Sequence, residues 1–235
     1  MTAAAAFVDP TACEEDGPLR ILNGPDALII ADPMHGTGGR WIESFLSGGK
    51  LQVKTIRAHR DPLFGGVFPE PMPQHLGALA SAIRENGALI GLATDGDADR
   101  VGAMLKTATG YHFLTGNQIG SLLLESIARK KTKSLSKPFI CKTIVTTELQ
   151  RLIADSYQIK TVETLTGFKY IAEKVAEDPE NYLFGGEESF GYLPVHWVRD
   201  KDSLSSALAL AELAEDVDLV QALDEIYLKH GLFHE

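Results

Sequence analysis

The sequence predicts an α/β fold with two tandem α/β units, each a mixed four-stranded sheet with flanking helices. Short apolar runs of strand length alternate with longer segments whose apolar residues recur at helical spacing. Glycine, proline and asparagine stand between many of these segments, where the chain must turn. The pattern of a strand followed by a helix, and then a strand followed by a helix, occurs twice along the chain. This pattern is typical of sheets whose strands are joined by helical crossovers.

The first unit is expected at residues 25–115. Its middle, residues 60–73, holds four prolines and two adjacent glycines, so it is predicted to be a loop rather than regular structure. Asn86-Gly87 is a stop signal for the helix that precedes it. Strands are expected at 27–31, 52–56, 88–93, 101–105 and 111–114, and helices at 41–46 and 76–85.

The second unit is expected at residues 116–216, followed at 217–235 by a helix and a linker. Residues 1–24 are weakly patterned and are predicted to be a poorly ordered lead-in. Asn117 is of a residue type that caps helices, so we expect it to cap the first helix of this unit. Strands are expected at 139–145, 160–164 and 182–185, and helices at 117–130, 147–156, 168–177, 204–214 and 219–229.

The composition narrows the class of protein. The formal net charge of −10 argues against a nucleic-acid or membrane partner, because both are anionic. The two cysteines, Cys13 and Cys141, lack metal-site or redox spacing, which favours a reduced, cytoplasmic protein. No apolar run approaches the roughly 18 residues of a membrane span.

An acidic run follows one of the predicted strands. Asp95, Asp97 and Asp99 are spaced at i, i+2 and i+4, and small residues separate them. Carboxylates at this density would repel one another unless a divalent cation lay between them. Hard oxygen ligands of this kind suit Mg²⁺ or Ca²⁺.

Three kinds of loop could account for such an acidic run. An EF-hand needs glycine and glutamate where this chain has Arg100 and Lys106, so an EF-hand is excluded. A phosphatase of the haloacid-dehalogenase type would place such a loop near the start of its domain and would leave later motifs unexplained. A solvated acidic turn is common, but it seldom lies between two apolar strands and ends in arginine.

The run D-G-D-A-D-R at residues 95–100 resembles the metal-loop signature of the α-D-phosphohexomutases, the phosphoglucomutase/phosphomannomutase superfamily. Further segments resemble other family motifs, in the family's order. The residues of two of them, E-E-S-F-G-Y at 187–192 and R-D-K-D at 199–202, are more similar to the phosphoglucomutase/phosphopentomutase branch. The further segments are D-P-M-H-G-T-G at 32–38 and F-G-G with P-E-P at 64–71 in the second domain, and T-G-F-K-Y-I at 166–171, G-G-E-E-S-F-G-Y at 185–192 and R-D-K-D at 199–202 in the third.

The resemblance implies a role for each candidate residue. Asp95, Asp97 and Asp99 would hold Mg²⁺, and Arg100 would contact a phosphoserine phosphate. Pairing of Arg100 with a loop aspartate is the alternative, and both roles can hold at once. Substrate binding would fall to Glu187, Ser189, Gly167 and Lys169. The catalytic residues would be Arg100, Lys142 and Lys169, and either lysine could serve as the general acid/base or only bind phosphate. For the glutamate a solvated turn, and for the lysines a surface position, remain as alternatives.

The implied activity is that of an intramolecular phosphotransferase, an isomerase of carbohydrate metabolism. Such an enzyme interconverts a hexose 1-phosphate and 6-phosphate, or pentose 1-phosphate and 5-phosphate, through a bisphosphate. The family's T-x-S-H-N-P-like phosphoserine loop and R-x-S-G-T-like phosphate loop do not occur in this sequence. The resemblance therefore implies the second and third domains only, inactive alone and partnered by the missing first and fourth domains. The linker within residues 217–235 would lead toward that fourth domain. The alternatives are a catalytically dead sugar-phosphate-binding module and a Mg²⁺-dependent phosphatase.

Overall fold

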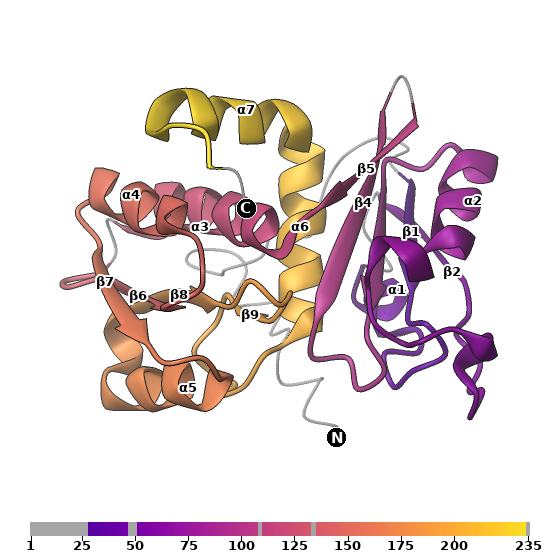
Figure 1. The fold of residues 1–235 in the computed structure, drawn as a ribbon, viewed down its shortest axis with the longest axis horizontal. Coiled ribbons are helices and arrows are strands. Elements are labelled where there is room, and N and C mark those ends of the chain that lie inside the picture. Colours follow the sequence, from indigo (N-terminus) through magenta and orange to yellow (C-terminus); the bar gives the residue numbers. More distant parts are fainter. Residues whose placement is uncertain (1–27, 47–50, 108–109, 133–134, 234–235) are drawn as a thin grey trace.

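Two α/β units lie side by side in the computed structural model, one on each side of a long helix (Figure 1). The structure describes residues 28–46, 51–107, 110–132 and 135–233. The lead-in expected at residues 1–24 lies outside this described part. None of the described helices combines the length and the apolar character needed to cross a membrane.

The first unit is built on a five-stranded sheet in the order β2-β1-β3-β4-β5. The first three strands along the chain are parallel to one another. The fourth strand pairs antiparallel with the third, and the fifth pairs antiparallel with the fourth, which confirms the α/β class and the mixed sheet. The expected number of four strands is wrong for this sheet, because both strands of the hairpin near residue 109 pair into it. The strands are β1 (Leu28–Asp32), β2 (Gln52–Thr55), β3 (Ile90–Thr94), β4 (Val101–Thr107) and β5 (Gly110–Leu114).

Helices cover both faces of this sheet. α2 (Gly77–Asn86) buries Leu79 and Ile83 against one face and ends at Gly87, whose left-handed φ of 66° makes the predicted stop. α1 (Trp41–Leu46) packs beside β2. The proline-rich loop contains two short 3₁₀ helices, η2 (Phe64–Gly66) and η3 (Pro73–His75).

The second unit has a four-stranded sheet in the order β7-β6-β8-β9, as expected in number. One strand of it, the two-residue β9 (Tyr192–Leu193), has no counterpart in the prediction, because a run that short carries no periodic signal. The other elements are β6 (Phe139–Thr143), β7 (Lys160–Thr164), β8 (Tyr182–Gly186), α3 (Gly116–Lys131), α4 (Glu148–Ser156), α5 (Phe168–Glu177) and η5 (Pro179–Asn181).

The start of α3 corrects one prediction. The cap is Thr115 rather than Asn117: the Thr115 hydroxyl accepts the backbone N–H of Gln118, and the Gln118 side chain accepts the backbone N–H of Thr115. This reciprocal pair satisfies two N–H groups that would otherwise lack partners. The Asn117 side chain instead accepts the backbone N–H of Thr147 at the start of α4.

The helix α6 (Ser203–Asp216) lies between the two sheets (Figure 1). It packs against β3 and β4 of the first unit and against α3 and β9 of the second, so it is buried on several sides. Apolar residues of both units therefore form one continuous core with it, including Leu92 of β3, Leu123 of α3 and Leu210 of α6 itself. The last helix, α7 (Leu219–His230), packs across α3 and α4.

Candidate active site

The three aspartates of the acidic run lie together at the carboxyl end of β3. One carboxylate oxygen from each of Asp95, Asp97 and Asp99 lies within 4.8 Å of the other two. Ala98, between the last two, has a left-handed φ of 62°, which turns the loop back on itself. Three converging carboxylates form a donor set of hard oxygens, so the residues present fit a Mg²⁺ ion.

Asp95 also organises the loop. Its Oδ1 accepts the backbone N–H groups of Asp99 (3.0 Å) and Arg100 (3.1 Å), and its Oδ2 accepts the Arg100 Nε–H at 2.6 Å. Arg100 also pairs with Glu70 at 3.0 Å. Burial on its own would lower the pKa of Arg100, but the bonds to Asp95 and Glu70 outweigh it and raise that pKa. Of the roles left open for Arg100, pairing with a loop aspartate is the one present in this structure.

Two other loops form backbone hydrogen bonds with Gly96 of the acidic run, residues 95–100, which we call the metal loop. The backbone N–H of Thr37 donates to the carbonyl of Gly96 at 3.0 Å, and the N–H of Gly96 donates to the carbonyl of Pro69 at 3.1 Å. A Cβ atom at Gly36 would lie 2.6 Å from the Gly96 carbonyl oxygen, so only glycine permits this approach. The glycine turn and the proline-rich loop of the first unit thus position the aspartates.

The loop between β8 and β9, residues 187–191, carries Glu187 and Ser189, two of the expected substrate-binding residues. We call it the sugar loop. Its ends are joined because the Glu187 N–H donates to the Gly191 carbonyl at 2.9 Å. The buried Glu187 carboxylate accepts the backbone N–H of Gly167 at 3.0 Å, so the structure brings these two predicted residues together. Burial raises the pKa of Glu187, although the Gly167 N–H and the charge of Lys201 oppose that rise. Ser189 is exposed.

The two predicted lysines differ in their surroundings. Lys142 is fully buried, with its Nζ 2.7 Å from Glu148 and 2.9 Å from Glu163, so it is not the surface lysine that the sequence left open. It also donates to the backbone carbonyl of Thr146 at 3.1 Å and so anchors the turn after β6. Lys169 is exposed, with its Nζ 4.8 Å from the centre of the Tyr170 ring.

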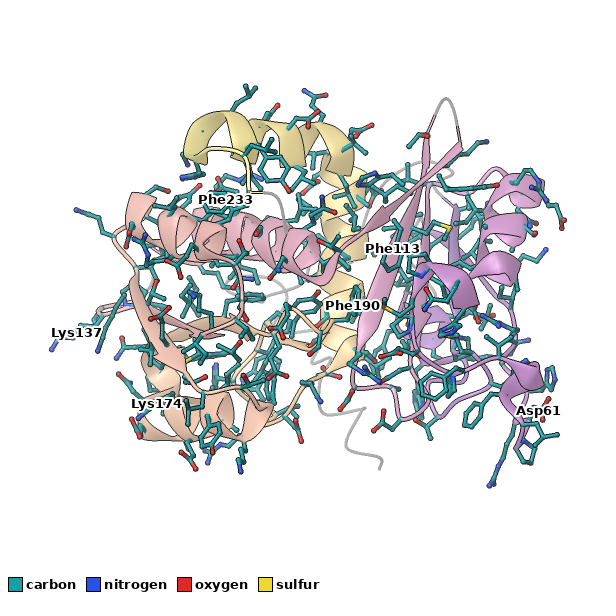
Figure 2. The ribbon with its side chains drawn as sticks, viewed as in Figure 1. Asp61, Phe113, Lys137, Lys174, Phe190 and Phe233 are labelled. Atoms are coloured by element: carbon teal, nitrogen blue, oxygen red, sulfur yellow. The ribbon has the colours of Figure 1, made fainter. Side chains whose placement is uncertain are left out.

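The metal loop and the sugar loop are bonded to each other. The Val101 N–H, directly after the metal loop, donates to the Phe190 carbonyl at 3.1 Å. The rings of Phe113 and Phe190 point toward each other across the two units, with centroids 5.8 Å apart (Figure 2). Lys201 Nζ lies 2.8 Å from Asp99 Oδ2. The two loops, far apart in sequence, therefore lie next to each other.

Sequence reasoning assigned no role to two charged residues of this site. Lys201 lies within the R-D-K-D run, and that run was the only available signal for it. Glu188 accepts hydrogen bonds from the hydroxyls of Thr146 (3.2 Å) and Thr143 (3.4 Å). These contacts hold the sugar loop against the carboxyl end of β6.

Two family models match the chain. The model for phosphoglucomutase/phosphomannomutase alpha/beta/alpha domain II matches residues 19–110, and the model for alpha/beta/alpha domain III matches residues 115–230.

Individual proteins show the same likeness. A phosphoglucomutase from Staphylococcus aureus (strain N315) is 30% identical over 220 residues, which are 88% of this chain and 40% of that protein. A Thermus thermophilus protein assigned as a phosphomannomutase superposes with a TM-score of 0.81 at 28% identity, covering 99% of this chain and 50% of that one. An Aspergillus fumigatus N-acetylphosphoglucosamine mutase, solved with GlcNAc-6P and magnesium, has a TM-score of 0.54 at 15% identity over 97% and 50% of the two chains, which supports the fold alone. The chain thus spans about half or less of the length of these proteins.

Proposed function

Because this chain belongs to the phosphoglucomutase/phosphomannomutase family, whose second and third domains it matches, we propose that it supplies the Mg²⁺ loop and the sugar loop of a phosphosugar mutase. The family resemblance read from the sequence motifs is confirmed by these matches. The proposed reaction moves a phosphoryl group between the two ends of a hexose or pentose phosphate through a bisphosphate. The residues at 187–192 and 199–202 favour the phosphoglucomutase/phosphopentomutase branch.

One observation carries the proposal most strongly. The metal loop and the sugar loop meet at the carboxyl ends of β3 and β8, joined by the Val101–Phe190 backbone bond and the Asp99–Lys201 ion pair. A phosphoryl-transfer site needs a divalent cation beside a group that orients the sugar, so that the reacting oxygen is placed correctly. An acidic turn that served only as a solvated surface loop would have no need of the sugar loop beside it.

The metal ligands we propose are Asp95, Asp97 and Asp99. When bound, Mg²⁺ supplies positive charge that stabilises the negative charge building on a transferring phosphoryl group. Arg100 is held beside the ligands because its Nε donates to Asp95 and one terminal nitrogen donates to Glu70. We propose that it contacts a phosphate through the remaining N–H groups, or by exchanging one of these carboxylates.

The substrate contacts we propose are Glu187, Ser189, Gly167 and Lys169. A carboxylate accepts hydrogen bonds from two sugar hydroxyls, and a serine hydroxyl adds a donor and an acceptor, which suits vicinal hydroxyls. The exposed ammonium of Lys169 is available to a phosphate or to a proton-transfer step. Lys142 is engaged by Glu148 and Glu163, so it would reach a substrate only by exchanging one of these carboxylates.

The remaining chemistry is proposed to come from the family's first and fourth domains. The chain lacks the family's phosphoserine and phosphate-gripping motifs, so we propose that it has no mutase activity by itself. We also propose a cytoplasmic location, because Cys141 is a free, buried thiol, as is usual in reducing compartments.

A complementation assay tests this function. The chain is assayed for mutase activity with glucose 1-phosphate, Mg²⁺ and glucose 1,6-bisphosphate, alone and mixed with separately expressed first and fourth domains of a family member. We expect no turnover alone, turnover in the mixture, and loss of that turnover in Asp97→Asn but not in Lys174→Met, which removes a partly exposed charge on α5.

Three results would overturn the proposal. Robust turnover by the chain alone would show that no separate phosphoserine is required. Phosphate release from p-nitrophenyl phosphate that disappears in Asp97→Asn would indicate a Mg²⁺-dependent phosphatase instead. Sugar-phosphate binding without turnover in any mixture would indicate a binding module.

A further inference from the structure

Lys201 lies between the two loops of the candidate site. Its Nζ is 2.8 Å from Asp99 Oδ2, and its charge also acts on Glu187 in the sugar loop. We propose that Lys201 is a positioning residue that holds Asp99 as a built-in counter-ion and thereby lowers the affinity of the three aspartates for a divalent cation. This inference rests on the metal loop of the proposed function and adds a residue that tunes it.

The backbone directly after Lys201 is held in place by Asp202. The N–H of Asp202 donates to the carbonyl of Tyr192 at 3.0 Å, which ties this segment to β9. The Asp202 carboxylate then caps α6 by accepting the backbone N–H groups of Leu204 (3.2 Å) and Ser205 (3.1 Å). The starting point of the lysine side chain is therefore set by two elements of the second unit.

The path of the side chain is shaped by the sugar loop. A Cβ atom at Gly191 would lie 2.2 Å from Lys201 Cδ, so the lysine stem crosses the space that a larger residue would fill. Gly191 has no need of a left-handed backbone here, since its φ is not in that region. The absence of a side chain at position 191 thus has a steric reason, which is passage of the lysine toward Asp99.

The charges at the end of this path explain the effect on metal binding. Lys201 and Asp99 are both largely shielded from water, with 21% and 28% of their side chains exposed. Charges in such a setting interact more strongly than in bulk water. A cation entering among the aspartates meets the lysine charge beside one of its ligands, and repulsion between the two cations weakens its binding.

A purely structural role for Lys201 makes the opposite prediction. If the lysine only fastened the loops together, its removal would loosen Asp99 and leave metal affinity unchanged or weaker. If it acts as a counter-ion, its removal leaves the aspartates with more uncompensated negative charge and strengthens metal binding. The direction of the change separates the two roles.

The test measures Mn²⁺ binding by electron paramagnetic resonance, because Mn²⁺ favours the same oxygen ligands as Mg²⁺. We expect Lys201→Met to bind Mn²⁺ about tenfold more tightly than the unaltered chain. Lys201→Arg keeps the cation and should stay within about twofold of the unaltered chain. Lys174→Met is the matched control, since it removes one positive charge from α5, where the partly exposed Lys174 pairs with Glu177 (Figure 2).

Equal or weaker Mn²⁺ binding in Lys201→Met than in Lys174→Met would overturn the proposal. Gly191→Ala provides a second route if Lys201→Met does not fold, because the added methyl group displaces the lysine stem; it too should tighten binding, and unchanged binding counts against the proposal. The failure of the metal loop itself looks different: neither the unaltered chain nor Lys201→Met would bind Mn²⁺.

Discussion

The Glu187 carboxylate is buried at the start of the sugar loop. A carboxylate exposed on the surface would keep its hydration, whereas a buried one loses hydration, which costs free energy. Burial raises its pKa, and the Gly167 N–H and the Lys201 charge offset only part of that rise. The residue therefore destabilises the folded chain whenever it is ionised. Such a cost is typical of a group retained for binding rather than for folding.

This cost predicts the effect of Glu187→Gln. Below the ordinary pKa of 4.5, the carboxyl is protonated in the folded and unfolded chain alike, so burial carries no ionic penalty. The penalty grows as the pH rises through the raised folded pKa and is complete above it. We expect Glu187→Gln to raise the melting temperature in metal-free buffer at pH 7, by up to about 4 °C, and to have little effect near pH 4.

The exposed Glu180 of η5 provides the control, since Glu180→Gln should leave the melting temperature unchanged at both pH values. A Glu187→Gln chain that melts lower than the unaltered chain at pH 7 would show that the carboxylate is a net stabilising group.

At the residue scale, sequence spacing predicted the groups whose chemistry depends on near neighbours. The three aspartates are two residues apart, so their convergence follows from a tight turn after a strand. Lys142 and Lys201 have decisive partners up to 102 residues away, in Glu148, Glu163 and Asp99. No local pattern encodes such partners, because they depend on which strands and helices lie together.

At the element scale, periodicity predicted the long helices and the buried strands well, since each has a clear apolar face. Two of the errors lie where few residues carry the signal: the two-residue β9 and the cap of α3. A third is the number of strands in the first sheet, five rather than four. Thr115 and Asn117 are both capping types, and only the Thr115–Gln118 reciprocal pair decides between them.

The first turn of α3 also predicts a sensitive glycine. A Cβ atom at Gly116 would lie 1.8 Å from the Glu188 carbonyl oxygen, so the helix end and the sugar loop would have to separate. We expect Gly116→Ala to lower the free energy of unfolding by about 1–3 kcal/mol, measured by urea denaturation.

The chain offers a matched control for this substitution. Gly77 occupies the same first position in α2, and a Cβ atom there would meet no atom within 4 Å. Gly77→Ala should be neutral or slightly stabilising, because alanine favours helix over glycine. Equal effects of the two substitutions would mean that contact with the sugar loop contributes nothing at Gly116.

At the scale of the whole molecule, the order of elements predicted two α/β units but not how they meet. α6 was predicted as a helix from the helical spacing of its apolar residues. It follows the second sheet in sequence, but in the structure it also covers the first sheet. Period alone cannot say which sheet a helix covers, particularly for a helix that is apolar on several sides. The shared core is therefore a property that only the three-dimensional structure displays.

A shared core predicts that the two units unfold together. The chain has two tryptophans, Trp41 in α1 of the first unit and Trp197 near β9 of the second. We expect Trp41→Phe and Trp197→Phe, each with one remaining reporter, to show urea transitions by fluorescence that coincide with the loss of helical circular dichroism.

Each single-tryptophan chain is compared with its own dichroism curve, so a change in stability caused by the substitution does not affect the comparison. Fluorescence midpoints that depart from the dichroism midpoints, in opposite directions for the two reporters, would show that the units unfold separately and that α6 does not couple them.

The backbone bond from Val101 to Phe190 has a consequence for how a ligand would behave. It sets the spacing of the metal loop and the sugar loop through main-chain atoms, which cannot change rotamer as side chains do. In the proposed mutase, a bisphosphate must present first one end and then the other to the same three aspartates. With the frame stationary, the reorientation would belong to the sugar, which would have to release the sugar loop, turn end for end and be gripped again through different hydroxyls.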